Sequence, residues 1–213
     1  MRRLRMNLPR VLGSIVIWGV ATAFALYVAL HLLRPDYNPA RQFLSAYAIG
    51  PFGGLMTAEF FVQALISLAL AVGLLLKVRR SRSLLVGCLV LIIVAVTLVI
   101  LGLFPGNLSD LNGGPLSRSG AIHQFTGMIS FPSRIVAFLL LPRAYKYDQQ
   151  WQAFARTARR VGLAFLGLFI AFVVVVRWDL GGLAQRAAVA VGLLWLLLNG
   201  LQLRRSARPA DLP

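Results

Sequence analysis

Six long apolar runs, separated by short polar segments, constrain the fold of this chain more than any other feature of its sequence. An α-helix rises about 1.5 Å per residue, so about 20 apolar residues cross the roughly 30 Å hydrocarbon core of a bilayer. The first four runs are long enough to do so, and the last two are marginal without their flanking residues. The pattern predicts an all-α fold, a polytopic transmembrane bundle of six helices. The expected spans are 11–33, 55–76, 84–104, 121–141, 161–178 and 187–203.

The composition leaves no room for a water-soluble domain beside this bundle. Hydrophobic residues make up 59% of the 213 residues and charged residues 13%, and the mean hydropathy is +0.78. Such values exclude an ordinary soluble domain. We therefore expect one membrane domain that covers residues 1–213.

The positive charge is concentrated in every second segment between the runs. Of the 22 Lys and Arg residues, 16 lie in the two terminal segments and in residues 77–82 and 143–160, five lie in the alternate segments, and Arg134 lies inside a run. The positive-inside rule then predicts that both termini are cytoplasmic. The formal net charge of +16 also suits a nucleic-acid-binding protein, but here the positive residues flank apolar runs. We expect contacts with membrane lipids and none with nucleic acid.

The first loop on the less basic side, residues 34–54, carries signals for a short helix of its own. Asn38 before Pro39 is typical of a helix start, and Gly50 before Pro51 of a helix stop. Apolar and aromatic side chains between them fall on one face. This pattern predicts a short interfacial helix with its apolar side toward lipid or the bundle.

The first run also carries a stripe of small residues. Ala21, Ala25 and Ala29 repeat every four residues, which places them on one face of a helix. Small side chains let another helix approach closely. We therefore expect this stripe to face a neighbouring helix.

Two ionisable residues, Glu59 and Arg134, lie inside the apolar runs. A charge in a bilayer is costly, by about 2.5–3.5 kcal/mol on insertion scales, so such residues are the first candidates for function. Counted from the same boundary at the usual helical rise, Glu59 lies roughly 6 Å deep and Arg134 roughly 20 Å deep. A direct bridge between them would need a broken or tilted helix, and Pro132 provides one such kink.

Polar residues of the fourth run fall on one helical stripe, which begins at its outer end with His123 and includes Thr126, Gly127, Ser130 and Arg134. Such a stripe should face the interior of the bundle. His123 matches Glu59 in depth, and Glu59 shares a face of the second run with Gln63, four residues away.

We expect these two faces to meet as a polar pocket open to the outside. An equally open interpretation is that the stripes are only hydrogen-bonding contacts between helices. The predicted ligand-binding residues are Arg41, Ser45, Glu59, His123 and Arg134, with Asp110 as a further candidate.

The sequence lacks the standard catalytic signatures. It has no phosphate-binding glycine loop, and its two His and one Cys cannot form a His-rich metal site within one chain. We therefore expect neither a metal nor a cofactor. A carboxylate, His and Ser arrangement remains open, in which His123 acts as general base beside a carboxylate, Glu59 or Asp110, and a hydroxyl group, Ser45 or Ser119.

Several of these residues stand in motifs that resemble the prokaryotic domain-of-unknown-function family 998. The motifs are Arg-Pro-Asp-Tyr-Asn-Pro at 34–39, Arg-Gln-Phe-Leu-Ser at 41–45, Phe-Pro at 104–105 with Asp110, and Gly-Ala-Ile-His at 120–123. The resemblance covers most of the chain and implies a bacterial or archaeal plasma-membrane protein of about six spans. A Ser in the first loop and a His at the start of a later span also resemble the Frag1/DRAM/Sfk1 group, which is linked to lipid handling.

Four functions are compatible with these features. The leading hypothesis is a protein that binds or handles a lipid headgroup or similar amphiphile in the outward-facing pocket. A second is a lipid-modifying hydrolase or transferase that uses His123. A third is a small-solute or proton-coupled transporter that uses Glu59 and Arg134, although the fourth run is purely apolar between Arg134 and Pro142. A fourth is a structural partner for another membrane protein.

Overall fold

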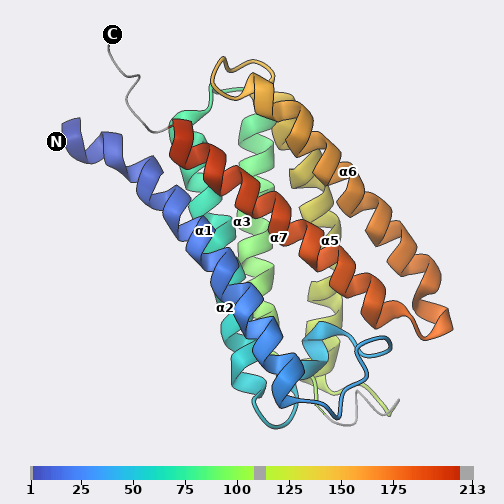
Figure 1. Cartoon of the computed structure of the whole chain (residues 1–213). Helices are drawn as coiled ribbons and strands as arrows, with labels where there is room; N and C mark the ends of the chain where they lie inside the picture. Colours follow the sequence, from blue (N-terminus) through green and yellow to red (C-terminus); the bar gives the residue numbers. More distant parts are fainter. Residues whose placement is uncertain (1, 108–113, 207–213) are drawn as a thin grey trace.

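The computed structural model describes residues 2–107 and 114–206, and within these ranges its regular structure is entirely helical. Six helices are long and apolar enough to cross a membrane, which confirms the predicted all-α bundle (Figure 1). The chain is therefore a multi-pass membrane protein. The helices are α1 (Arg2–Leu33), α2 (Gly53–Lys77), α3 (Arg82–Leu103), α5 (Arg118–Tyr145), α6 (Gln152–Val175) and α7 (Gly181–Ser206).

The helices extend beyond the apolar runs at both ends of the bundle. The basic segment that was counted from residue 143 to 160 is mostly helical, because α5 continues to Tyr145 and α6 begins at Gln152. Ser81 and Ser117 cap α3 and α5, since their hydroxyl groups accept hydrogen bonds from backbone N–H groups in the first turn. Polar caps outside the apolar runs thus set where these helices start.

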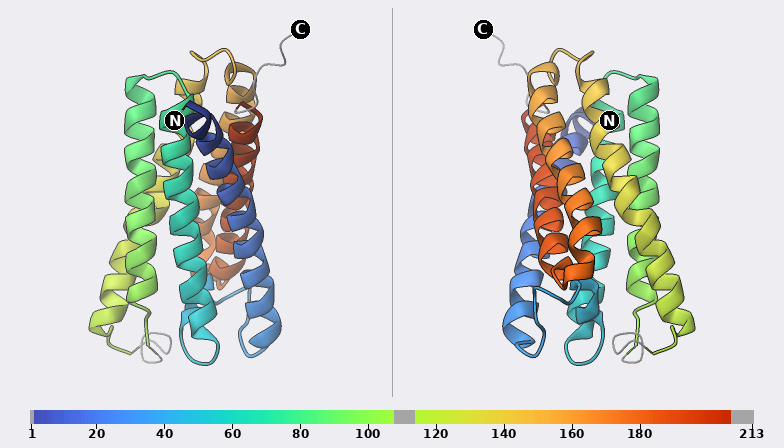
Figure 2. Two further views of the ribbon diagram at one scale, coloured as in Figure 1. Left: turned by 90° about the vertical axis from the view of Figure 1, so that its left-hand side faces the viewer. Right: turned by 90° about the vertical axis from the view of Figure 1, so that its right-hand side faces the viewer.

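The six helices form a ring in which neighbours are antiparallel. In order around the ring, α1 packs on α2, α2 on α3, α3 on α5, α5 on α6, α6 on α7, and α7 on α1. We call the end that holds residues 34–52 the loop end, and the end that holds residues 78–81 and 146–151 the basic end. Helix α1 begins and α7 finishes at the basic end (Figures 1 and 2).

The basic end is tightly packed. The backbones of Gly73 and Gly200 lie so close to Leu203 and Val16 that an added Cβ would come within 2.3 and 2.7 Å of these side chains. Trp195 stacks on Phe138 with the ring centroids 4.0 Å apart. Close packing here brings α2 and α7 into contact across the ring. The space within the ring is therefore concentrated toward the loop end.

The contact face of α1 differs from the predicted one. Ala21 and Ala25 are exposed on the outer side of the helix and Ala29 is half-buried, so the expectation that this stripe faces a neighbouring helix was wrong. The buried face instead carries Val16, Val20, Ala23, Tyr27 and Leu30. These larger side chains bury more apolar surface, and Tyr27 also finds a hydrogen-bond partner on α2.

The first loop contains a short 3-10 helix, η1 (Leu44–Ala48), and no helix that starts at Asn38. The Asn38 side chain accepts a hydrogen bond from Ala40 N at 2.9 Å and forms a turn. Leu44 and Tyr47 of η1 are buried, so its apolar side faces the bundle. Its position at a membrane interface stays a prediction.

Arg34 holds this loop together. The side chain is only 7% exposed, and its Nε and Nη2 donate to the Asp36 carboxylate at 2.8–3.2 Å. Its Nη1 donates to the carbonyls of Ile49 and Pro51 at 2.9 and 3.1 Å, and the guanidinium lies 4.1 Å from the Tyr37 ring centroid. These hydrogen bonds hold the pKa of the Asp36 carboxyl below its ordinary value. One side chain thus joins the two ends of the loop.

Replacing Arg34 with Ala should lower the free energy of unfolding by about 1–3 kcal/mol, because two loop carbonyls lose a charged donor. Thermal unfolding of the purified protein in detergent measures the change. Arg118→Ala is the control, since Arg118 is exposed at the same end of the bundle. Equal midpoints for the two variants would contradict this role of Arg34.

Candidate functional site

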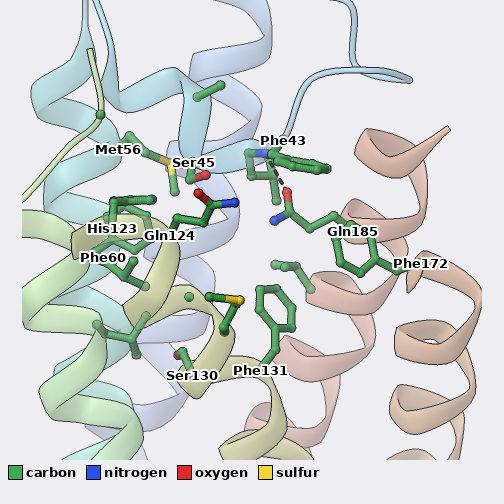
Figure 3. Close-up of a pocket in the computed structure, with 18 of the residues that line it drawn as sticks. Phe43, Ser45, Met56, Phe60, His123, Gln124, Ser130, Phe131, Phe172 and Gln185 are labelled. Atoms are coloured by element: carbon green, nitrogen blue, oxygen red, sulfur yellow. Dashed lines mark hydrogen bonds between the residues drawn. The ribbon is translucent and has the colours of Figure 1, made fainter. Parts of the chain in front are cut away.

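A cavity of about 670 Å³ lies within the ring toward the loop end. Such a volume is within the range of sites that hold one small-molecule ligand. Side chains from the first loop and from α1, α2, α3, α5, α6 and α7 line it (Figure 3). All six helices of the bundle and the first loop thus meet at the cavity.

The loop-end part of the cavity carries polar groups. Ser45 comes from η1, His123 and Gln124 from α5, and Gln185 from α7 (Figure 3). Gln185 accepts a hydrogen bond from Leu44 N at 2.7 Å. The rest of the wall is mostly apolar and aromatic and includes Met56, Phe60, Leu98, Phe131, Phe172 and Val189.

The deep end of the cavity is polar again and is formed by Tyr27, Gln63, Ser130 and Arg134. Arg134 lies 11 residues after His123 on α5, which corresponds to about 16 Å along the helix axis. The cavity is therefore polar at both ends and apolar between them.

Tyr27, Gln63 and Glu59 form a hydrogen-bonded group that reaches the cavity through Tyr27 and Gln63. Gln63 Nε2 donates to Tyr27 Oη at 2.9 Å and also to Glu59 Oε1. Glu59 is fully buried. Its Oε2 and the Oε1 of Gln63 have no hydrogen-bond partner within the described part of the chain. Buried acceptors without partners are rare, and they often mark a functional site.

Arg134 is 8% exposed and lines the cavity. Its charge acts on Glu59 and Tyr27. Among residues 2–107 and 114–206, however, the ion pairs within 4 Å are Arg34–Asp36 and Arg41–Asp179, and no hydrogen bond of Arg134 occurs. The Phe131 ring centroid lies 5.8 Å from the guanidinium. A buried cation therefore reaches the cavity without a direct partner in this part of the protein.

The structure brings most of the sequence-predicted site residues to this one cavity. Arg41, Ser45, His123 and Arg134 all line it, whereas Glu59 lies behind its wall and contacts it through Gln63. Asp110 lies outside the described residues. Whether any of these residues binds a ligand stays a prediction.

His123 and Glu59 do not face each other directly. The His123 ring packs edge-on against Phe60, with the ring centroids 5.9 Å apart, and its Nδ1 lies 3.0 Å from the carbonyl oxygen of Phe104. Glu59 precedes Phe60 and points toward Gln63 on the side of Tyr27. The polar stripe of α5 does face the interior, because Thr126, Ser130 and Arg134 are buried.

A comparison with protein families adds a second line of evidence. The family model described as "Protein of unknown function (DUF998)" matches residues 17–202. The chain belongs to this family. This match confirms the resemblance drawn from the loop motifs. Searches of curated proteins and of solved structures each gave no significant match. The DUF998 match runs from α1 to α7, so it includes every helix that lines the cavity.

Sequence reasoning missed one polar contact of this DUF998 bundle, which attaches the first loop to α7. Arg186 Nη1 donates to the carbonyls of Pro39 and Gln42 at 2.8 and 2.6 Å, and its Nε donates to His31 Nε2 at 2.8 Å. Arginine can only donate, so His31 Nε2 is the acceptor and its Nδ1 donates to the Tyr27 carbonyl at 2.7 Å. His31 thus accepts a hydrogen bond from Arg186, and the pair helps to hold the first loop, which lines part of the cavity.

Sequence reasoning also missed Tyr27 and Gln185 as residues of the cavity. Tyr27 is a polar group inside the first apolar run, which was the available signal, whereas Gln185 lies just before the sixth run. Tyr27 is hydrogen-bonded to Gln63, 36 positions away, and Gln185 is hydrogen-bonded to Leu44, 141 positions away. No local spacing rule finds pairs at such separations.

Arg186→Met in this DUF998 protein should loosen the first loop, because two backbone carbonyls lose a charged donor. We expect the amides of Leu44 and Leu183 to exchange with solvent roughly 10- to 100-fold faster, which corresponds to the loss of a hydrogen bond to a charged group. Hydrogen–deuterium exchange read by mass spectrometry checks this. Arg177→Met, at an exposed arginine, is the matched control. Unchanged exchange in Arg186→Met would contradict the role assigned to this contact.

Proposed function

We propose that this DUF998 protein binds a membrane amphiphile in the cavity at the loop end. The observation that carries the proposal is the high exposure of two cavity-lining residues on neighbouring helices. Met128 of α5 and Val173 of α6 both line the cavity and are 62% and 54% exposed, from which we infer a sideways opening between α5 and α6. An opening at this level faces acyl chains, whereas a water-soluble ligand would need only the opening at the loop end.

The arrangement of the helices supports this route. Helices α5 and α6 diverge toward the loop end (Figure 2, right). Helix α6 buries only a small share of its apolar span within the bundle. Its inner face contributes Phe169 and Phe172, which stack with Phe131 at centroid distances of 5.9 and 6.4 Å. Aromatic side chains beside an opening give an alkyl chain a large apolar surface to contact.

The polar groups at both ends of the cavity support an amphiphile over a purely apolar ligand. Ser45, Gln124 and Gln185 lie at the loop end, and Gln63 and Arg134 lie at the deep end. Apolar sites with a few well-placed polar groups bind ligands in a fixed orientation. The ligand therefore needs a polar group as well as an alkyl chain.

Leucine at Gly127 should reduce the amphiphile bound to the purified protein at least several-fold. Gly127 lines the cavity, and a Cβ added there meets nothing within 4 Å, so the larger side chain fills the space without a clash. The fold should be retained, because glycine inside a helix is about 0.5–1 kcal/mol less favourable than alanine. Mass spectrometry of lipids that copurify with the intact protein measures the loss.

Gly167→Leu provides the matched control for this experiment. Gly167 also has open space around it, but it is exposed on α6 and does not line the cavity. This variant should keep the wild-type lipid content. The same lipid content in Gly127→Leu as in Gly167→Leu would end the proposal.

We further propose that the loop end faces the outside of a prokaryotic plasma membrane, with both termini in the cytoplasm. The excess of Lys and Arg at the basic end supports this orientation. In intact cells, a membrane-impermeant maleimide should label Pro115→Cys and should label Arg80→Cys only after permeabilisation. Both positions are exposed, and the native Cys88 is buried. The reverse labelling pattern would overturn the orientation.

A further inference from the structure

We infer that the amphiphile is an anion and that Arg134 binds its negatively charged group at the deep end of the cavity. This inference rests on the proposed function and adds the chemical class of the ligand. The guanidinium of Arg134 is buried, has five N–H donors and has no hydrogen-bond partner in the part of the chain that the structure describes. Burying an unpaired charge is costly, so such residues are almost always paired.

The neighbouring carboxylate does not satisfy Arg134. One oxygen of Glu59 accepts a hydrogen bond from Gln63, and no ion pair joins Glu59 to Arg134 within 4 Å. The Glu59 carboxylate offsets the positive charge of Arg134 electrostatically, but it leaves the N–H donors of Arg134 available. A guanidinium binds carboxylate and phosphate oxygens through two parallel hydrogen bonds. The free donors of Arg134 therefore match an oxyanion.

The distribution of charge around the cavity also favours an anion. Among the described residues that line it, the side chains that are always charged are Arg41 and Arg134, and both are positive. Arg41 is exposed and lies 3.4 Å from Asp179 at the surface, so its charge is partly neutralised there. Glu59 does not line the cavity. Arg134 is thus the charged side chain that a ligand meets directly at the deep end, and in a low-dielectric site such a charge acts strongly.

The position of Arg134 sets the orientation of the ligand. Arg134 lies two residues after Pro132 and one turn beyond Ser130, so the anionic group would lie below the apolar part of the cavity. The alkyl chain would then run past Phe131 and leave between Met128 and Val173. An amphiphile with a carboxylate or phosphate at the end of a single alkyl chain fits this arrangement. A free oxyanion has the charged group but no alkyl chain.

Binding by the purified full-length protein in a nonionic detergent tests the inference. The probes are dodecanoate, dodecyl phosphate, dodecanol and inorganic phosphate at neutral pH. The wild type should bind the two anionic amphiphiles at least tenfold more tightly than dodecanol. Arg134→Gln should weaken binding of both anions at least tenfold, about 1.4 kcal/mol, and leave dodecanol affinity unchanged. Glu59→Gln should strengthen the binding of both anions, because it removes the nearby negative charge.

Each alternative outcome decides a different point. Equal affinity of the wild type for dodecanol and dodecanoate overturns the inference without using any variant, and amphiphile binding as such would still stand. Arg134→Gln protein that binds dodecanoate like the wild type also overturns it. Inorganic phosphate that binds as tightly as dodecyl phosphate and depends equally on Arg134 supports the anion site but contradicts the amphiphile function.

Discussion

The positive charge of Arg134, which has no direct partner among the described residues of a bundle that crosses a membrane, is the constraint on which the proposed function depends. A charged side chain at such depth is stable only if something polar reaches it. The basic end of the ring is closely packed, so a polar group reaches Arg134 through the cavity and not from that end. Glu59, Gln63 and Tyr27 lie near Arg134, but they are mainly hydrogen-bonded to one another. The cavity and the cation therefore form one site.

Arginine has a different role at the loop end of this DUF998 protein. Arg34 and Arg186 use their guanidinium groups to bind backbone carbonyls of the first loop, and both are structural. Together they place Gln42, Phe43 and Leu44 beside the cavity. The guanidinium groups of Arg34 and Arg186 are thus surrounded by acceptors, whereas that of Arg134 has no acceptor among the described residues.

Much of the fold could be predicted from the sequence because hydrophobic length is a local property. About 20 apolar residues are enough to predict a span, and six such runs gave six helices. The intramembrane charges Glu59 and Arg134 were equally visible, and the helical rise alone separated them in depth. The face that each helix presents is not local, however. The alanine stripe of α1 was assigned to the wrong side because the better partners, among them Tyr27 and Gln63, become neighbours only after folding.

The loop shows a second limit of local patterns. Asn38 and Pro39 resemble a helix start, but the Arg186 side chain binds the carbonyls of Pro39 and Gln42 and holds the segment as a turn. Arg186 and His31 are 155 residues apart, so this contact leaves no signal in spacing. Arg186 is one of the five positive residues on the less basic side, and it serves there as a tertiary hydrogen-bond donor.

A structure of the full-length protein in lipid nanodiscs, determined by electron cryomicroscopy, would test the central claim most directly. We predict elongated density that begins at the Arg134 guanidinium, follows the aromatic wall and emerges between Met128 and Val173. An Arg134 side chain joined directly to Glu59, with α5 and α6 closed against each other and no density in the cavity, would contradict it.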